Sequence, residues 1–407
     1  MGYYHPTMTN RAGTMAHDRP STVGGTTVLL VLTFLNSVGT SVLWNGMSFV
    51  FKHQFHYPEW KTMMVYVVTA IVYVSAASAA GPLLSRSRGR LSARGLIGIA
   101  FAFEIAPITL LPWASPETTL LVAAVTASIA GALLWPVMEA YVAGGKHGHA
   151  MRKSIGVWCI AWMSAVTLTL IAMGPLFALE NIAGATVTGI VLVGAVSLLL
   201  LGLLPRHPAP HPHDAEVAPP AYKPLLDSAR ILLPVSYVLV SAMAAMLPYT
   251  LSALALPDTW QTPLAATWLG VRTFATGILA FTHGWHGRWG AIGIAALGLV
   301  GGFAIVSFGP TVPVVLAGLA CFGLGHAIAY YAALYYAMRV GSAGVEAGGT
   351  HEALIGAGYV AGPLVAAGGV AMGGSVGMPT AVLALCVISG IPALRPFIRW
   401  RRTQALG

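Results

Sequence analysis

Twelve long apolar runs constrain what this chain can fold into more than any other feature of its sequence. A helix needs roughly 20 consecutive apolar residues to cross a bilayer. Runs of about this length occupy residues 26–50, 61–83, 95–113, 118–144, 154–178, 184–204, 229–255, 262–283, 288–308, 312–339, 350–371 and 377–397. Only 8% of the 407 residues are charged, which leaves too little polar surface for a soluble protein. We therefore predict an all-α integral membrane protein with twelve transmembrane helices.

The basic residues fall almost entirely in every second gap between these runs. These gaps and the C-terminal tail carry Arg86, Arg88, Arg90, Arg94, Lys146, Arg152, Lys153, Arg206, Lys223, Arg288, Arg339, Arg399, Arg401 and Arg402. The alternate gaps hold Lys52 and Lys61 after the first run and no Lys or Arg thereafter. Because cationic loops stay in the cytoplasm, this pattern predicts that both termini are cytoplasmic. We expect a multi-pass protein of a bacterial inner (plasma) membrane.

The longest polar segment between two runs, from Pro205 to Pro224, is rich in proline and histidine. This composition predicts an extended cytoplasmic linker. Its three histidines could bind a metal ion, but a solvated linker is the favoured interpretation. The predicted parts are an N-terminal tail (1–25), a six-helix bundle (26–204), the linker (205–228), a second six-helix bundle (229–397) and a C-terminal tail (398–407).

The net charge and the cysteines exclude several other classes of protein. A charge of +9 could suit a nucleic-acid-binding protein, but the basic residues lie at the ends of runs and form no patch. Cys159, Cys321 and Cys386 all lie inside apolar runs, which excludes a disulfide framework and zinc-type spacing. No ATP-binding loop occurs. We predict a monomer with no nucleic-acid partner, no cofactor and no metal site.

The two predicted bundles carry similar turns at corresponding positions. The chain reads Gly81-Pro-Leu-Leu-Ser-Arg-Ser-Arg-Gly-Arg90 after the second run and His283-Gly-Trp-His-Gly-Arg-Trp-Gly290 after the eighth. Internal repeats of this kind are typical of secondary transporters. The layout and the first turn resemble the major facilitator superfamily. The loop pattern of that family is Gly-x-Leu-x-Asp-Arg-x-Gly-Arg-Arg. This chain matches it at Gly81, Leu83, Arg86, Gly89 and Arg90. It differs in having Ser85 in place of the Asp and one extra residue before Gly89.

The resemblance implies two pseudo-symmetric six-helix bundles around a central cavity that spans 1, 4, 7 and 10 line. In each of these spans except the fourth, polar or aromatic residues recur at intervals of four and so share one helix face. A further basic residue, Arg272, lies deep inside the eighth run, where it could meet an anionic substrate or form a structural ion pair. The predicted substrate-binding residues are Asn36, Thr40, Trp44, Tyr237, Ser241, Arg272, His326 and Tyr330.

Ionisable residues at membrane depth are the candidates for proton coupling. Glu104, Glu139 and His326 are such residues, although Glu104 could equally be a structural, hydrogen-bonded carboxyl. By the family resemblance, Glu139 is expected to pair with Arg86 or Arg90 and to close the cytoplasmic face as a gate.

The second bundle offers a counterpart of this gate. There we expect Glu352 to pair with Arg288. His351-Glu352 also resembles the start of the HExxH metalloprotease motif, but Ile355 stands where the second histidine would be.

These features together predict a secondary active transporter that moves a small organic solute, with an anionic solute as one option. It would work by alternating access and be coupled to protons. The alternatives are a multidrug-type exporter of lipophilic compounds, a copper or other metal-ion importer, and a non-transporting membrane sensor. A membrane-embedded enzyme is disfavoured because no catalytic constellation is found at a span end.

Overall fold

The computed structural model describes residues 23–146, 148–210, 218–340 and 345–405, and these residues form helices without any strand. Within these described ranges, twelve helical segments are long and apolar enough to cross a membrane, which confirms the predicted number. The first six are α1 (Val23–Ser41) with η1 (Val42–Gly46) and α2 (Met47–Phe55), α3 (Glu59–Arg86), α4 (Ala93–Ile105) with η2 (Ala106–Leu110), α5 (Pro116–Ala143), α6 (Gly148–Leu176), and α7 (Ile182–Leu200) with η3 (Leu201–Leu203).

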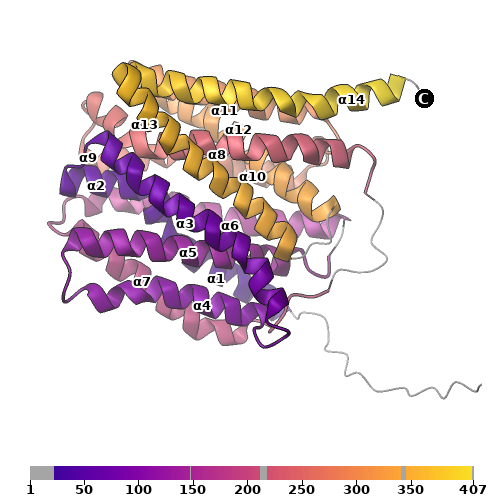
Figure 1. Ribbon diagram of the computed structural model, residues 1–407, viewed down its shortest axis with the longest axis horizontal. Coiled ribbons are helices and arrows are strands. Elements are labelled where there is room, and N and C mark those ends of the chain that lie inside the picture. Colours follow the sequence, from indigo (N-terminus) through magenta and orange to yellow (C-terminus); the bar gives the residue numbers. More distant parts are fainter. Residues whose placement is uncertain (1–22, 147, 211–217, 341–344, 406–407) are drawn as a thin grey trace, which may run out of the picture.

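The second six begin after the linker. They are α8 (Tyr222–Ala253), α9 (Asp258–Ala265) with α10 (Thr267–Phe281), α11 (Trp289–Phe308), α12 (Val312–Val340), the first part of α13 (Val345–Gly390), and its second part with η4 (Ile391–Ala393) and α14 (Leu394–Ala405). The two groups form the two halves of the molecule in Figure 1, with most of α1 to α7 in the lower part and most of α8 to α14 in the upper part, while α3 and α13 run obliquely where the halves meet. Across the interface, α13 packs on α3 and α10 packs on α6.

Several helices begin where the sequence supplies a capping side chain. Ser92 accepts a hydrogen bond from the Gly95 amide at the start of α4, and Ser115 does the same for Thr118 at the start of α5. These bonds satisfy amides that the first helical turn leaves without a partner.

Three boundaries differ from the expected ones. Helix α8 begins at Tyr222, so it includes the end of the predicted linker. Helix α14 continues to Ala405 through most of the predicted C-terminal tail. Spans 11 and 12 form one assigned helix, α13, which is broken by non-helical backbone at Gly373 and Gly374. Gly374 has φ of +60° and ψ of −141°, a conformation that glycine adopts most readily.

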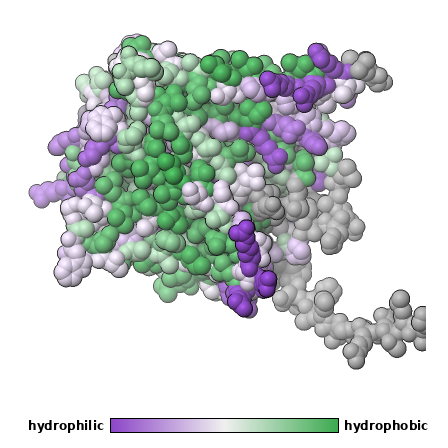
Figure 2. Space-filling model, viewed as in Figure 1, coloured by the Kyte–Doolittle hydropathy of each residue, from purple (hydrophilic) through white to green (hydrophobic). Residues whose placement is uncertain are grey.

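The surface is consistent with a protein that spans a membrane. Figure 2 shows a broad apolar band in the middle of the molecule, with hydrophilic side chains gathered towards its two ends. We call the end that carries the turn Arg86–Arg94 and the start of α8 the basic end, and the end that carries α2 and α9 the opposite end.

Candidate functional site

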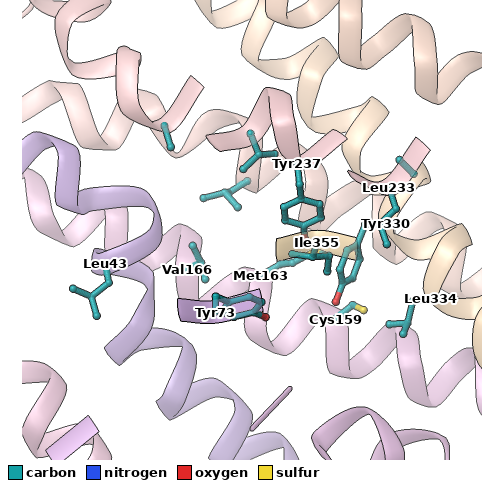
Figure 3. Close-up of a cluster of buried hydrophobic side chains, with 14 of the residues drawn as sticks. Leu43, Tyr73, Cys159, Met163, Val166, Leu233, Tyr237, Tyr330, Leu334 and Ile355 are labelled. Atoms are coloured by element: carbon teal, nitrogen blue, oxygen red, sulfur yellow. The ribbon is translucent and has the colours of Figure 1, made fainter. Parts of the chain in front are cut away.

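A cavity of about 80 Å³, room for several water molecules, lies between the two halves. It draws on spans 1, 4, 7 and 10 and also on spans 2, 5 and 11. Figure 3 shows Tyr73 of α3, Tyr237 of α8 and Tyr330 of α12 arranged around Ile355 of α13. The residues that line the cavity are Ser37, Ser41, Trp44, Asn45, Tyr73, Trp135, Trp162, Val166, Tyr237, Tyr330, Glu352, Ile355 and Tyr359.

In span 1 the face turned to the cavity differs from the expected one. Ser37, Ser41 and Trp44 line the cavity, whereas Asn36 is buried and does not. The side chain of Thr40 lies outside the part of the chain that the structure describes. Both serines precede the π-helical turn Val42–Gly46, so the face of α1 that lines the cavity is set by how this helix is rotated against its neighbours.

Arg272 of α10 is buried among aromatic rings beside the cavity. Its guanidinium carbon lies 4.6 Å from the ring centre of Trp162, 4.7 Å from that of Tyr330 and 5.9 Å from that of Trp268. Only 2% of the residue is exposed, and its Nε and Nη2 atoms have no hydrogen-bond partner among the described residues. The rings stabilise the cation in part, but they leave the Nε and Nη2 donors unused.

His326 of α12 is fully buried and belongs to the same aromatic group. Its ring centre lies 5.0 Å from that of Tyr237, 5.7 Å from that of Trp268 and 6.4 Å from that of Tyr330. Neither ring nitrogen has a hydrogen-bond partner in the described part of the chain. His326 and Arg272 therefore share two aromatic neighbours and lie on the same side of the cavity.

The two candidates of α8 have different surroundings. Tyr237 lines the cavity, and its ring centre lies 5.0 Å from that of Tyr359. Ser241 instead donates hydrogen bonds to the carbonyl oxygens of Tyr237, at 2.8 Å, and Gly358, at 3.3 Å. A side chain at Gly362 would collide with Ser241, so the serine lies where α8 and α13 cross and is used in packing.

Glu104 of α4 lies apart from the cavity. The residue is buried, and neither carboxylate oxygen has a partner among the described residues. A Cβ atom added at Gly194 of α7 would lie 3.3 Å from Glu104 Oε2, which shows that the carboxyl faces α7 within the first half. The structure thus does not bring Glu104 together with the other candidates.

Glu139 of α5 lies beside His351 and Glu352 of α13. Each of the three residues has one potential ligand atom, a carboxylate oxygen or an imidazole nitrogen, that lies within 4.8 Å of those of the other two. The three residues are buried. The Tyr73 hydroxyl donates a hydrogen bond to Glu352 Oε2. Because Glu139 is in the first half and the other two are in the second, this cluster joins the two halves.

The ion pairs expected for the cytoplasmic gate are not formed in this conformation. Arg86, Arg90 and Arg288 are exposed, and within the described ranges no ion pair joins them to Glu139 or Glu352. The reason is the close approach of α13 to α5 at Gly348, where an added Cβ atom would lie 3.0 Å from the Pro136 backbone. This approach places Glu352 against Glu139.

The two halves are also joined at the opposite end, by polar contacts. His53 Nε2 lies 3.1 Å from Gln261 Oε1, and His53 Nδ1 lies 3.2 Å from Asp258 Oδ2. Lys52 donates to the carbonyl oxygen of Pro248 at 3.1 Å, and Ser48 donates to that of Ala244 at 2.6 Å.

At the basic end, Arg152 of α6 makes the main polar contact between the halves. The residue is 1% exposed, and its Nε donates to the Ala280 carbonyl oxygen at 3.1 Å. Its guanidinium also contacts the ring of His283, with Nη2 2.9 Å from Nε2. Burial, Arg152 and His283 together lower the pKa of nearby His286 to about 4. Contacts at both ends therefore close the cavity between them.

Several residues of the site were not expected from the sequence. Tyr73, Trp162 and Tyr359 line the cavity from spans 2, 5 and 11, respectively, and these spans were not expected to line it. A signal for Trp162 was present, because Trp158 lies four residues before it and both rings contact Trp135.

The fold and the cavity define a helical membrane protein of two six-helix halves with a central, closed site. The human organic anion transporter MFSD10 (TETRAN) is similar to it, with a TM-score of 0.66 and 16% sequence identity over 92% of this chain and 100% of that one. The nucleoside transporter NupG is similar to it with a TM-score of 0.63 and 14% sequence identity, over 91% of this chain and 98% of that one. A bacterial homologue of the human lysosomal transporter Spinster, in an inward-facing and unoccupied conformation, has a TM-score of 0.62 and 14% sequence identity, over 93% of this chain and 98% of that one.

These likenesses confirm that the chain has the fold of the major facilitator superfamily. At such low sequence identity they concern the fold alone. No protein-family model matches the sequence, and no curated protein matches it.

Proposed function

We propose that this protein is a secondary transporter that moves a small organic solute with an anionic group by alternating access. Arg272 is the observation that carries the proposal. A buried guanidinium is normally paired, because an uncompensated charge in a low-dielectric interior is costly. Arg272 has no ion pair in the described part of the chain and keeps two unused nitrogens beside the cavity. A carboxylate or phosphate of a solute would supply the missing acceptor.

The aromatic wall of the cavity supports a solute that also has a flat, apolar part. The rings of Trp44 and Tyr359 are stacked, with centres 4.7 Å apart and an interplanar angle of 21°. Tyr73 and Tyr237 pack on the same pair edge-on. Stacked aromatic surfaces of this kind can accept another ring. Two of the similar structures, an organic anion transporter and a nucleoside transporter, are in line with such a solute.

Alternating access is supported by the way the halves meet. The contacts at the two ends come from different residues, so either set can break while the other persists. Opening at one end would widen the small cavity and admit the solute from that side. By the positive-inside rule we propose that the basic end, and with it both termini, faces the cytoplasm of a bacterial cell.

Proton coupling is the finer part of the proposal, and His326 supports it. A protonated His326 would be repelled by Arg272, with which it shares the rings of Trp268 and Tyr330. A solute anion bound to Arg272 would cancel this repulsion and favour protonation of His326. Solute and proton would then bind together. Glu104 and Glu139 remain further predicted proton carriers.

The test is transport and binding with matched pairs of solutes in proteoliposomes. Each aromatic carboxylate in the panel is compared with its neutral amide. We expect the Arg272→Gln variant to bind the carboxylate at least tenfold more weakly, because one charged hydrogen-bonding partner is lost. Arg399→Gln, which changes an exposed arginine, is the control.

Other results would favour the other functions. Equal binding of acid and amide, or an unchanged affinity of Arg272→Gln, would contradict the anion proposal. Transport of lipophilic cations would favour a multidrug-type exporter, transport of copper would favour a metal-ion importer, and binding without transport would favour a sensor.

A further inference from the structure

The cluster of Glu139, His351 and Glu352 contains two carboxylates, which the proposed binding of an anion at Arg272 does not use. Two carboxylates and one imidazole from opposite halves meet in the interior, with 2%, 3% and 3% of the residues exposed, respectively. Their ligand atoms lie within 4.8 Å of one another, so the three residues form a group that could hold one metal ion. Oxygen and nitrogen donors in such a mixture suit divalent transition-metal ions.

The ligand atoms of the cluster point to an occupant because three of them have no partner among the described residues. Both oxygens of Glu139 and Nε2 of His351 lack a hydrogen-bond partner in the described ranges. Among these ranges no lysine or arginine forms an ion pair with either carboxylate, and Arg230, whose charge acts on His351, is exposed. Two carboxylates without a countercharge repel each other strongly at this depth.

The surroundings hold one ligand in place. The Tyr73 hydroxyl donates a hydrogen bond to Oε2 of Glu352. Outer hydrogen bonds of this kind orient the carboxylates that bind metals. The close approach of α13 to α5 at Gly348 sets the distance between the two carboxylates.

We propose that Glu139, His351 and Glu352 bind one divalent transition-metal ion, of the Zn²⁺ or Mn²⁺ type, across the interface of the two halves. The three side chains provide one imidazole nitrogen and two carboxylate groups, and the cavity next to Glu352 supplies room for water as a further ligand. Binding displaces any proton shared by the two carboxylates. The ligands separate when α13 leaves α5, so the ion binds only while the basic end is closed and stabilises that state.

The binding test uses the purified full-length protein, without a polyhistidine tag and treated with a chelator. His207, His211 and His213 of the linker are replaced by serine to remove adventitious binding there. Mn²⁺ is titrated and followed by electron paramagnetic resonance, and Zn²⁺ is added as a competitor. We expect one saturable Mn²⁺ per chain, a coupling to one histidine nitrogen in pulsed spectra, and displacement by Zn²⁺.

Variants then assign the ion to the cluster. Glu139→Gln, His351→Asn and Glu352→Gln should each weaken Mn²⁺ binding at least tenfold. Glu104→Gln is the matched control, because Glu104 is also a buried membrane carboxylate without a hydrogen-bond partner among the described residues. The histidine coupling in the unmodified cluster tests the proposal even if a variant fails to fold.

Some results would overturn the inference. These are no saturable binding of either ion at neutral pH, a bound ion without nitrogen coupling, or equal binding by the cluster variants. Release of protons on acid–base titration without any metal binding would mean that the cluster holds protons only. None of these outcomes bears on Arg272, so they would leave the proposed anion transport standing.

Discussion

The two sets of contacts that join the halves differ in how well their polar groups are satisfied. At the opposite end, Gln261 bonds through its amide to Ser252, Leu256 and Asp258 and faces His53. Near the basic end, Glu139 meets Glu352 and has no donor in the described part of the chain. The first set stabilises closure by ordinary hydrogen bonds, each contributing about 1 kcal/mol. The contact of Glu139 with Glu352, unlike that of Arg152 at the same end, opposes closure unless an ion or a proton is bound.

This difference indicates where control is exerted. Closure of the opposite end depends little on what is bound, because its groups satisfy one another. Closure near the basic end depends on occupancy of the cluster and on the contacts of Arg152. We therefore expect ligands and pH to change the basic end more than the opposite end. Distances between spin labels can measure each end, with pairs at Arg88 and Val340 for the basic end and at Trp113 and Trp260 for the opposite end.

The largest expected effect comes from Arg152→Gln. This change removes the buried charge that joins α6 to the Ala280 carbonyl and to His283, and it should weaken closure of the basic end by about 2 to 3 kcal/mol. The Arg88–Val340 distance should move from mostly short to mostly long. Lys153→Gln, at the exposed neighbouring position, should leave it unchanged. A distance that stays short in Arg152→Gln would show that packing alone closes this end.

A smaller effect is expected at the opposite end from Gln261→Ala. The loss of the buried amide removes its bonds to Asp258 and His53 together and should weaken closure by about 1 to 2 kcal/mol. The Trp113–Trp260 distance should lengthen in part of the population. Gln54→Ala serves as the control, since Gln54 bonds to Asn181 and Ala183 within the first half. If both variants open this end equally, general destabilisation is the better explanation.

The smallest expected effect is that of pH on the basic end. The pKa of His286 is lowered to about 4 by burial, by Arg152 and by His283. Of these two charges only Arg152 lies in the other half, so closure favours the neutral form of His286 through Arg152. The contribution of neutral His286 to the stability of the closed basic end is complete above the ordinary histidine pKa of about 6.5. It is lost as the pH falls towards 4. Because His286 is half exposed, we expect a loss of about 1 kcal/mol at pH 5.

The pH effect has its own control. His286 faces Tyr222, His283 and the rings of Trp285 and Tyr335, and among these His283 can add a positive charge. His286→Gln should therefore reduce the change in the Arg88–Val340 distance between pH 7.5 and pH 5 without abolishing it. An unchanged response would assign the pH dependence to another group.

The sequence predicted the fold well because membrane helices are recorded locally. Each span needs only its own apolar run, so all twelve are found without knowledge of their neighbours. Arg272 and His326 were recognised as unusual for the same reason, since a basic residue inside an apolar run is costly wherever it packs.

The finer arrangement of the site depends on contacts between helices and could not be predicted in this way. The rotation of α1 against its neighbours places Ser37 and not Asn36 on the cavity face. The approach of Gly348 to Pro136 brings Glu352 to Glu139 and leaves Arg86 without its expected partner. Both features depend on how one helix packs against another. The spacing of residues along a single helix does not predict this packing.

The glycine turn at Gly373 and Gly374 has a mechanical consequence. It joins span 11, which carries Glu352, directly to span 12, and a Cβ atom added at Gly369 would collide with the Gly377 carbonyl, so the two spans are closely packed. Only 11% of the apolar window of span 12 is buried, which leaves most of this span facing lipid. Movement of Glu352 away from Glu139 would drag span 12 through the acyl chains. The thickness and viscosity of the bilayer would then enter the rate of each turnover.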